Sequence, residues 1–430
     1  MDGAAARPVV ALFGAFDTGD LGEVALRRVL EAELSRRRPD IDLIVLAPFG
    51  AEHPIPGDEG RPAQPLGAVE GGGWPAFDAL VISGDVLGDG EHWAARYPAA
   101  EDEMATRGVV ALSLTGARGG HGAALSVTWF AVGTAGGEAD VSGLVGKGVW
   151  ARDAATRQML GGTAVQSGDP LLLAARVLSA DALRRRADLL RMCGALPAGR
   201  SVVIEVATGF AASPPGQQLV EAVAEALRDD PKLSVVVATL NPIGQLSLAS
   251  VLRVPGLVAE RVHRLPDWVG LDDVAAAMSG SIAVLAITPA FAHLAASLRV
   301  PVAAVDNGIG DRFDPAIPVL TAVAPETLQT LIAGAHPAAI DTAIETLDGA
   351  FAELAQRLPR TASPATTPFD EDPVSSALAI LQRRLVDERT ALQAELSRVQ
   401  AELDHLRASP EHRIARPIRE GYQRWQRRRT

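Results

Sequence analysis

Cysteine and lysine are nearly missing from this 430-residue chain, and each shortage narrows what the protein can be. Cys193 is the only cysteine, which excludes an internal disulfide bond and any zinc site built from paired cysteines. Lys147 and Lys232 are the only lysines, so arginine carries almost all of the positive charge. The net charge of −12 argues against nucleic acid as a partner of the main body. Aromatic residues make up 4% of the chain, so we expect cores built from Ala, Val and Leu.

Several catalytic and cofactor motifs are also missing. The sequence contains no P-loop, no HExxH pair and no GxSxG nucleophile elbow. Its G-x-G strings, such as Gly146–Gly148, lack the strand, turn and helix that a dinucleotide site requires. We therefore expect neither a cofactor nor a metal ion.

Long uninterrupted apolar runs are missing as well. The first apolar run, Val9–Phe13, is short and is soon followed by acidic residues, so no secretory signal is visible. The longest apolar stretch, Ser281–Asp306, is interrupted by Thr288-Pro289, His293 and Arg299, which favours two strands around a helix over a membrane span. We expect a bacterial, cytoplasmic protein.

The sequence does contain an alternation of short apolar runs with amphipathic segments, which is typical of parallel sheets with helices on both faces. This pattern predicts two Rossmann-like α/β lobes, over 1–178 and 199–358, joined by an arginine-rich bridging helix over 179–198. The strands expected in the first lobe cover 8–13, 41–46, 78–83, 109–114 and 148–151. Those expected in the second lobe cover 201–206, 233–239, 282–287 and 300–305. Helices over 325–334 and 339–357 are expected to close the second lobe.

The turn at Thr288 has the features of an anion-binding helix start. Thr288 is suited to cap a helix, and Pro289 is suited to its first position. This start follows the carboxyl end of the strand at 282–287, where ligands of open α/β sheets bind. We therefore predict a donor or anion site formed by Thr288, Pro289 and Ala290.

Beyond the lobes, a Pro/Thr/Ser-rich linker at 359–373 leads into a heptad pattern over 374–407. Leucine or valine recurs every seven residues, at Leu378, Leu385, Leu392, Val399 and Leu406. Such heptads predict a coiled coil and hence a homo-oligomer, the alternative being one long helix packed on the body. The arginine-rich tail, 408–430, fits either peripheral contact with the inner face of the plasma membrane or a solvated end.

Five short motifs are distributed over residues 8–310. They are the loop Gly14–Asp20 with its Gly19-Asp20 pair, Ser83-Gly84-Asp85 after a strand, Ala151-Arg152-Asp153, Asp169-Pro170, and Val300-Pro301-Val302. Together they resemble the polysaccharide pyruvyl transferase family. The resemblance implies a GT-B-like fold and transfer of a pyruvyl group from phosphoenolpyruvate to a sugar hydroxyl.

The same resemblance assigns roles in the first lobe. It implies a saccharide acceptor held by Asp17, Gly19, Gly84 and Asp85, with Asp20 as a catalytic residue. Carboxylates are strong hydrogen-bond acceptors for hydroxyls, but Asp in a Gly-rich loop is also a common turn former or helix cap. Arg152, Asp153 and Asp169 are interpreted as structural motif residues.

The second lobe departs from the family pattern at its signature. Thr288, Pro289 and Ala290 occupy the positions of the family's Arg-Leu-His, whose Arg and His are thought to bind phosphoenolpyruvate and to act as acid or base. On a helical wheel, His293 falls nearly opposite Phe291 and Leu298, which are expected to face the sheet. His293 is therefore either a substitute catalytic acid or base, or a solvent-facing helix histidine.

We expect a pyruvyl transferase-like enzyme of cell-envelope or exopolysaccharide biosynthesis. Its partners would be phosphoenolpyruvate or a nucleotide-sugar as donor and a saccharide as acceptor. Two alternatives stay open. One is an inactive family member that acts as a coiled-coil scaffold in a glycan-assembly complex, and the other is a nucleotide-sugar glycosyltransferase.

Overall fold

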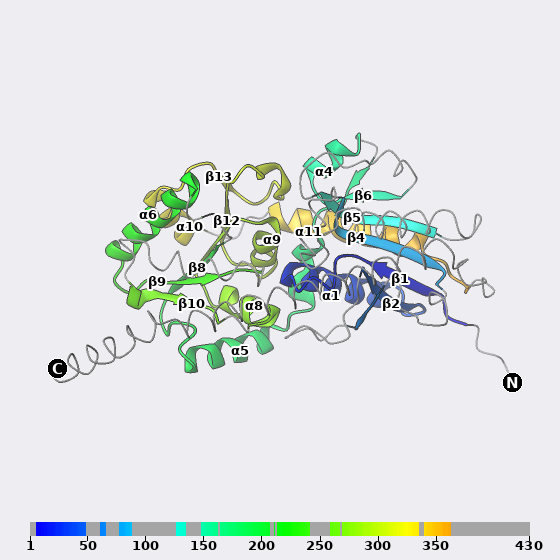
Figure 1. Ribbon diagram of the computed structural model, residues 1–430, viewed down its shortest axis with the longest axis horizontal. Helices are drawn as coiled ribbons and strands as arrows, with labels where there is room; N and C mark the ends of the chain where they lie inside the picture. The colour runs from blue at the N-terminus through cyan, green and yellow to red at the C-terminus, as the bar shows by residue number, and fades with distance from the viewer. Residues whose placement is uncertain are drawn as a thin grey trace, which may run out of the picture.

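The computed structural model contains two parallel sheets, each flanked by helices (Figure 1). It describes residues 6–48, 61–65, 77–87, 126–134, 148–161, 164–206, 210, 213–240, 259–266, 269–334 and 339–362. The two-lobed α/β architecture expected from the alternating pattern is confirmed, because the first sheet uses strands up to residue 166 and the second uses strands from residue 201 onward.

The first sheet has the strand order β3-β2-β1-β4-β5-β6-β7. These strands are β1 (Val9–Phe13), β2 (Asp42–Ala47), β3 (Ala63–Pro65), β4 (Ala79–Leu87), β5 (Ser126–Thr134), β6 (Val149–Ala151) and β7 (Val165–Gln166). Its helices are α1 (Leu21–Arg37), α4 (Ala154–Met159) and the 3-10 helix η2 (Pro170–Arg176). The strand order reverses at β1, because β2 and β3 are added on one side of it and β4 to β7 on the other.

The second sheet has the order β10-β9-β8-β11-β12-β13. These strands are β8 (Ser201–Glu205), β9 (Ser234–Ala238), β10 (Val262–Arg264), β11 (Ala283–Ala286), β12 (Val302–Val305) and β13 (Val319–Leu320). Its helices are α5 (Ala180–Met192), α6 (Pro214–Asp229), α8 (Leu271–Ser279), α9 (Pro289–Ser297) and α10 (Pro325–Ala333), with short 3-10 helices η5 (Ala259–Arg261) and η6 (Gly310–Arg312). Here the reversal falls at β8, between β9 and β11.

Side-chain alternation divides the second sheet between two hydrophobic cores. Val202 and Ile204 of β8 face the outer core under α6 and α10, whereas Val203 faces the central core. Successive strand side chains point to opposite faces, so the apolar runs read from the sequence are strands buried on both sides.

The central core is continuous between the lobes. Helices α1, η2 and α9 supply much of it, and η2 packs directly against both α1 and α9. The arginine-rich α5 packs on α8, where the Arg186 guanidinium bonds to the Asp273 carboxylate. The lobes are therefore joined by a packed interior as well as by the chain itself.

The last described helix, α11 (Ala339–Arg357), was expected from the sequence to close the second lobe. It packs instead against α1 and η2 of the first lobe. Phe351 is fully buried between the Phe130 ring of β5, 4.7 Å away between centroids, and the Arg37 guanidinium, which lies 5.2 Å over its ring. Arg38 donates to the carbonyls of Ala355 and Leu358 at the end of α11. These contacts join segments more than 200 residues apart, so no local pattern indicated them.

Several expected features lie outside the described residues. They are the strand at 109–114, the coiled coil at 374–407 and the basic tail at 408–430. Strands β3 and β5 were not anticipated from the sequence. None of the described helices is both long and apolar enough to cross a membrane.

Replacement of Phe351 by alanine tests the packing of α11 on the first lobe. We expect Phe351→Ala to lower the free energy of unfolding by about 3–5 kcal/mol, because it removes a fully buried ring and leaves a cavity. Chemical denaturation measures the change. Glu353→Ala on the same helix is the control, since its pair with Arg357 is exposed and should matter by less than about 1 kcal/mol. Equal effects of the two variants would contradict the placement of α11.

Candidate functional site

A cavity of about 420 Å³ lies between the lobes, where the carboxyl ends of the two sheets face one another. Its walls come from the segments after β1 and β4 in the first lobe and after β8 and β11 in the second, where the strand order of each sheet reverses. The residues that line it are Asp20, Gly22, Glu23, Leu26, Asp85, Arg152, Asp169, Leu171, Glu205, Thr239, Leu240, Thr288, Pro289, Ala290, Ile309 and Arg312. Such reversal points are where open α/β sheets bind their ligands.

Two helix starts meet at this cavity. Asp20 caps α1, and its carboxylate accepts from the backbone N–H groups of Gly22 (2.7 Å) and Glu23 (3.3 Å). The Leu21 N–H donates to the Leu240 carbonyl of the other lobe at 2.9 Å. A Cβ placed on Gly22 would lie only 3.1 Å from the Cβ of Ala290 at the start of α9. The α1 and α9 starts are therefore in close contact, which leaves little room for a larger residue at position 22.

Thr288 caps α9, as expected, but a carboxylate of the protein already occupies the turn. Its hydroxyl accepts from the Phe291 N–H at 3.4 Å and lies 2.6 Å from a Glu205 carboxylate oxygen, to which it donates. The other Glu205 oxygen accepts from the N–H groups of Ile287 (2.8 Å) and Thr288 (2.7 Å). The N–H groups predicted to meet a ligand anion are thus bonded to Glu205, because this side chain ends β8 beside the turn.

Glu205 is an acid of the cavity wall whose pKa is raised. It is only 2% exposed, and burial raises its pKa to about 7. The hydrogen bonds from Thr288 and Ile287 oppose this rise, and the nearby Asp20 carboxylate adds to it. A carboxyl group with a pKa near neutrality, on the wall of a cavity, is suited to proton exchange.

Arg152 is enclosed by carboxylates on the first-lobe wall. Its guanidinium bonds to Asp85, and its Nε lies 3.6 Å from oxygens of both Asp153 and Asp169. Burial alone would lower the pKa of Arg152, but these charges raise it, so the guanidinium stays protonated. Asp153 also caps α4 by accepting from the Thr156 N–H at 2.8 Å. The structure therefore keeps Arg152 and Asp85 together at the cavity.

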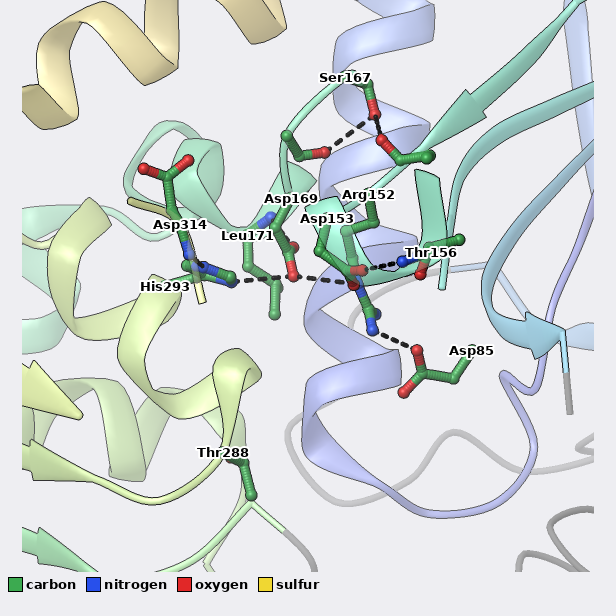
Figure 2. Close-up of polar contacts among 12 residues, drawn as sticks. Asp85, Arg152, Asp153, Thr156, Ser167, Asp169, Leu171, Thr288, His293 and Asp314 are labelled. Atoms are coloured by element: carbon green, nitrogen blue, oxygen red, sulfur yellow. Dashed lines mark hydrogen bonds and ion pairs between the residues drawn. The ribbon is translucent and has the colours of Figure 1, made fainter. Parts of the chain in front are cut away.

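Asp169 connects this group to the second lobe (Figure 2). One of its oxygens caps η2 by accepting from the Leu171 N–H at 2.8 Å, and the other lies 2.9 Å from Nδ1 of His293 on α9. Burial acts to raise the pKa of Asp169, but His293, Arg152 and the Leu171 N–H together lower it. Asp169 is thus an ionised bridge between the lobes, buried to 3% exposure.

His293 is neither solvent-facing nor part of the cavity wall. It is 2% exposed, and its Nε2 accepts from the Asp314 N–H at 3.1 Å while its Nδ1 faces Asp169. An Nε2 that accepts a bond leaves the proton on Nδ1, so both ring nitrogens are used inside the protein. This arrangement corrects the prediction of a catalytic His293, since its ring is positioned to hold the lobes together.

Arg312 is the cavity's second arginine, and it differs from Arg152. It lies at the end of η6 in the second lobe and is half-buried. Within the described ranges, its guanidinium has neither an ion pair nor a hydrogen bond, although it lines the cavity. Arg312 therefore presents an uncompensated positive charge to a ligand.

The predicted site residues are thus divided. The structure brings Asp20, Asp85, Arg152, Asp169, Thr288, Pro289 and Ala290 to the cavity wall. Asp17, Gly19 and Gly84 do not line it; Gly19 and Gly84 have positive φ angles, and a Cβ on Gly84 would lie 2.7 Å from Glu23. Sequence reasoning missed Glu205 and Arg312. A lone carboxylate ending an apolar strand could have indicated Glu205, whereas no local pattern indicated Arg312.

No family model matches the sequence, and no curated protein does either. Among solved structures, UDP-N-acetylglucosamine 2-epimerase from Rickettsia bellii is similar with a TM-score of 0.51 and 11% identity, over 82% of this chain and 95% of that one. The S. aureus MnaA–UDP complex has a TM-score of 0.49 and 12% identity, over 84% of this chain and 100% of that one. E. coli ADP-heptose lipopolysaccharide heptosyltransferase II has a TM-score of 0.39 and 13% identity, over 81% of this chain and 99% of that one. The chain therefore has a GT-B-like fold. This likeness in fold does not support the more specific assignment to pyruvyl transfer.

Replacement of Asp169 by asparagine tests the bridge between the lobes. We expect Asp169→Asn to lower the free energy of unfolding by about 3 kcal/mol at pH 7, because it removes a buried charge that bonds His293 and lies 3.6 Å from the Arg152 guanidinium. A lowered folded-state pKa stabilises the protein above the unfolded value near 4, and this contribution is lost as pH falls through the folded value. The difference from wild type should therefore shrink in acid.

Urea denaturation at several pH values measures this difference. Asp311→Asn is the matched control, since Asp311 is exposed in η6 and its loss should change the free energy by less than about 0.5 kcal/mol. A difference between wild type and Asp169→Asn that stays constant from pH 7 to pH 3 would show that the charge of Asp169 is not what stabilises the bridge.

Proposed function

We propose that this protein is a nucleotide-sugar-dependent enzyme of cell-envelope glycan synthesis, which binds its donor between the lobes and transfers the sugar to a saccharide acceptor. The observation that carries the proposal is an arginine with no described partner on one wall of the cavity and two fixed carboxylates on the other wall. Arg312 lies on the second-lobe wall, whereas Asp20 and Asp85 lie on the first-lobe wall. A protein of the same fold from Rickettsia bellii is named for UDP-N-acetylglucosamine, which makes this compound a suitable first donor to test.

The second-lobe wall suits the anionic part of a donor. Arg312 supplies a planar guanidinium that can bond two phosphate oxygens, and it has no competing partner among the described residues. The nearby start of α9 adds the positive end of a helix dipole, although Glu205 takes part of its hydrogen-bonding capacity. The cavity volume of about 420 Å³ is within the range that small-molecule sites occupy.

The first-lobe wall suits a hydroxyl-rich acceptor. The Asp20 and Asp85 carboxylates are held in place, by the N–H groups of α1 and by Arg152 respectively. A fixed carboxylate is a strong acceptor for sugar hydroxyls and can orient one of them toward the donor. Asp20 is the better candidate for a catalytic role, because it lies at the contact between the two helix starts and near Glu205.

Pyruvyl transfer from phosphoenolpyruvate is the second candidate, and the short sequence motifs favour it. Its difficulty lies in the absence of the expected Arg and His from positions 288–290. His293 does not replace them, since both of its ring nitrogens bond within the protein. Arg312 could still bind the carboxylate or phosphate of phosphoenolpyruvate, so the two donors are best compared directly. A scaffold role through the predicted coiled coil and basic tail would need neither donor.

Titration calorimetry with UDP-N-acetylglucosamine and with phosphoenolpyruvate distinguishes these functions. We expect UDP-N-acetylglucosamine to bind, and Arg312→Gln to weaken its binding by roughly 10- to 100-fold, because a charge-assisted hydrogen bond contributes about 1.5–3 kcal/mol. Arg200→Gln is the matched control, since Arg200 precedes β8 at the opposite end of the strand and pairs with Asp230. Its affinity should equal that of wild type.

Each other outcome has a definite meaning. Binding of phosphoenolpyruvate without UDP-N-acetylglucosamine would favour pyruvyl transfer. If Arg312→Gln and Arg200→Gln lose affinity for UDP-N-acetylglucosamine equally, Arg312 is not part of the donor site. Failure of both donors to bind wild-type protein would contradict an enzyme that uses either one and would favour the scaffold.

A further inference from the structure

Glu205 is placed where a bound anion would meet a negative charge of the protein. Its carboxylate lines the cavity and lies against the start of α9, and among the described residues its hydrogen bonds come from Ile287 and Thr288. The helix start would otherwise attract a phosphate. An ionised Glu205 would repel a phosphate there, and burial makes this repulsion stronger than it would be in water.

The other charges around Glu205 do not neutralise it. Asp20 faces it from the α1 start, and Glu23, Asp85 and Asp169 add negative charge on the first-lobe wall. Arg152 is bonded to Asp85 and so is already compensated. The neighbouring strands β9 and β11 contribute only apolar or hydroxyl side chains next to it. Arg312 is the one cavity cation that no described carboxylate pairs with.

We propose that Glu205 takes up a proton when a phosphate-bearing donor binds in the cavity, so that donor and proton bind together. The proton comes from solvent and converts the carboxylate to a carboxylic acid, which removes one negative charge and supplies an O–H donor to a phosphate oxygen. This inference rests on the proposed function, because it requires the anion to lie in this cavity.

Both protonation states of Glu205 are populated in the free protein near neutral pH. Burial raises the pKa of Glu205 to about 7, so the acid and its carboxylate coexist near neutral pH. A small additional repulsion from a ligand anion is then enough to move the population toward the acid. His293 also lies on α9, but its ring bonds to Asp169 and to the Asp314 N–H, and neither bond involves Glu205.

Calorimetry in two buffers of different ionisation enthalpy tests this linkage. UDP-N-acetylglucosamine is the probe, because its pyrophosphate is esterified at both ends and does not titrate between pH 6 and pH 8. With a free-protein pKa of about 7, wild type should take up about 0.8 proton per ligand at pH 7.5 if only the protonated form binds. The dissociation constant should rise about tenfold from pH 6 to pH 8 if only the protonated form binds.

Three variants locate the proton. Glu205→Gln imitates the neutral acid, so it should bind without proton uptake and with an affinity that does not change with pH. Glu221→Gln, an exposed position of α6, is the control and should behave as wild type. Thr288→Val keeps the carboxylate but removes one bond to its charged form, so it should move the pH dependence upward. Thermal melting checks that each variant is folded.

The outcomes separate this inference from the proposed function. Binding by wild type without proton uptake would overturn the role of Glu205 and leave the donor site intact. Proton uptake that persists in Glu205→Gln would assign the proton to another group and would also overturn it. If wild type does not bind the probe at all, the proposed donor site fails and the inference fails with it.

Discussion

The Asp169 carboxylate holds the two lobes in the arrangement on which the cavity depends. It caps η2, lies within ion-pair distance of Arg152 on the first-lobe wall, and accepts from His293 at the second lobe's helix α9. Arg152 in turn fixes Asp85, and His293 fixes the segment at Asp314 that follows Arg312. Figure 2 shows this chain of contacts running across the boundary between the lobes. Because every member is buried or half-buried, loss of one partner leaves others uncompensated in a region of low dielectric.

The same region explains the electrostatic character of the site. Two helix starts, those of α1 and α9, approach one another, and each already bonds a carboxylate of the protein, Asp20 and Glu205 respectively. These carboxylates occupy positions where a ligand's phosphate would otherwise be favoured. A ligand anion must therefore rely on Arg312 and on neutralisation of Glu205. This constraint is consistent with a site that discriminates among anions by protonation as well as by shape.

Local patterns predicted most of the fold, and long-range pairing accounts for what they missed. Thr288 before Pro289 indicated the start of α9, and the apolar runs at 201–206 and 282–287 indicated β8 and β11, because caps and alternation depend on neighbouring residues. Asp169 and His293 are 124 residues apart, and Arg38 and Ala355 are 317 apart, so neither contact had a local signal. The Thr288 turn lines the cavity, but Glu205 comes from another strand and bonds the N–H groups of that turn, which no local pattern indicated.

The central claim is that the carboxyl ends of the two sheets form one donor site, with Arg312 and the start of α9 on its anion-binding side. A crystal structure of the protein with UDP-N-acetylglucosamine tests this most directly. The account predicts phosphate oxygens within hydrogen-bond distance of the Arg312 guanidinium and next to Glu205, with the sugar directed toward Asp20 and Asp85. A ligand held elsewhere on the molecule, with the cavity between the lobes empty, would contradict it.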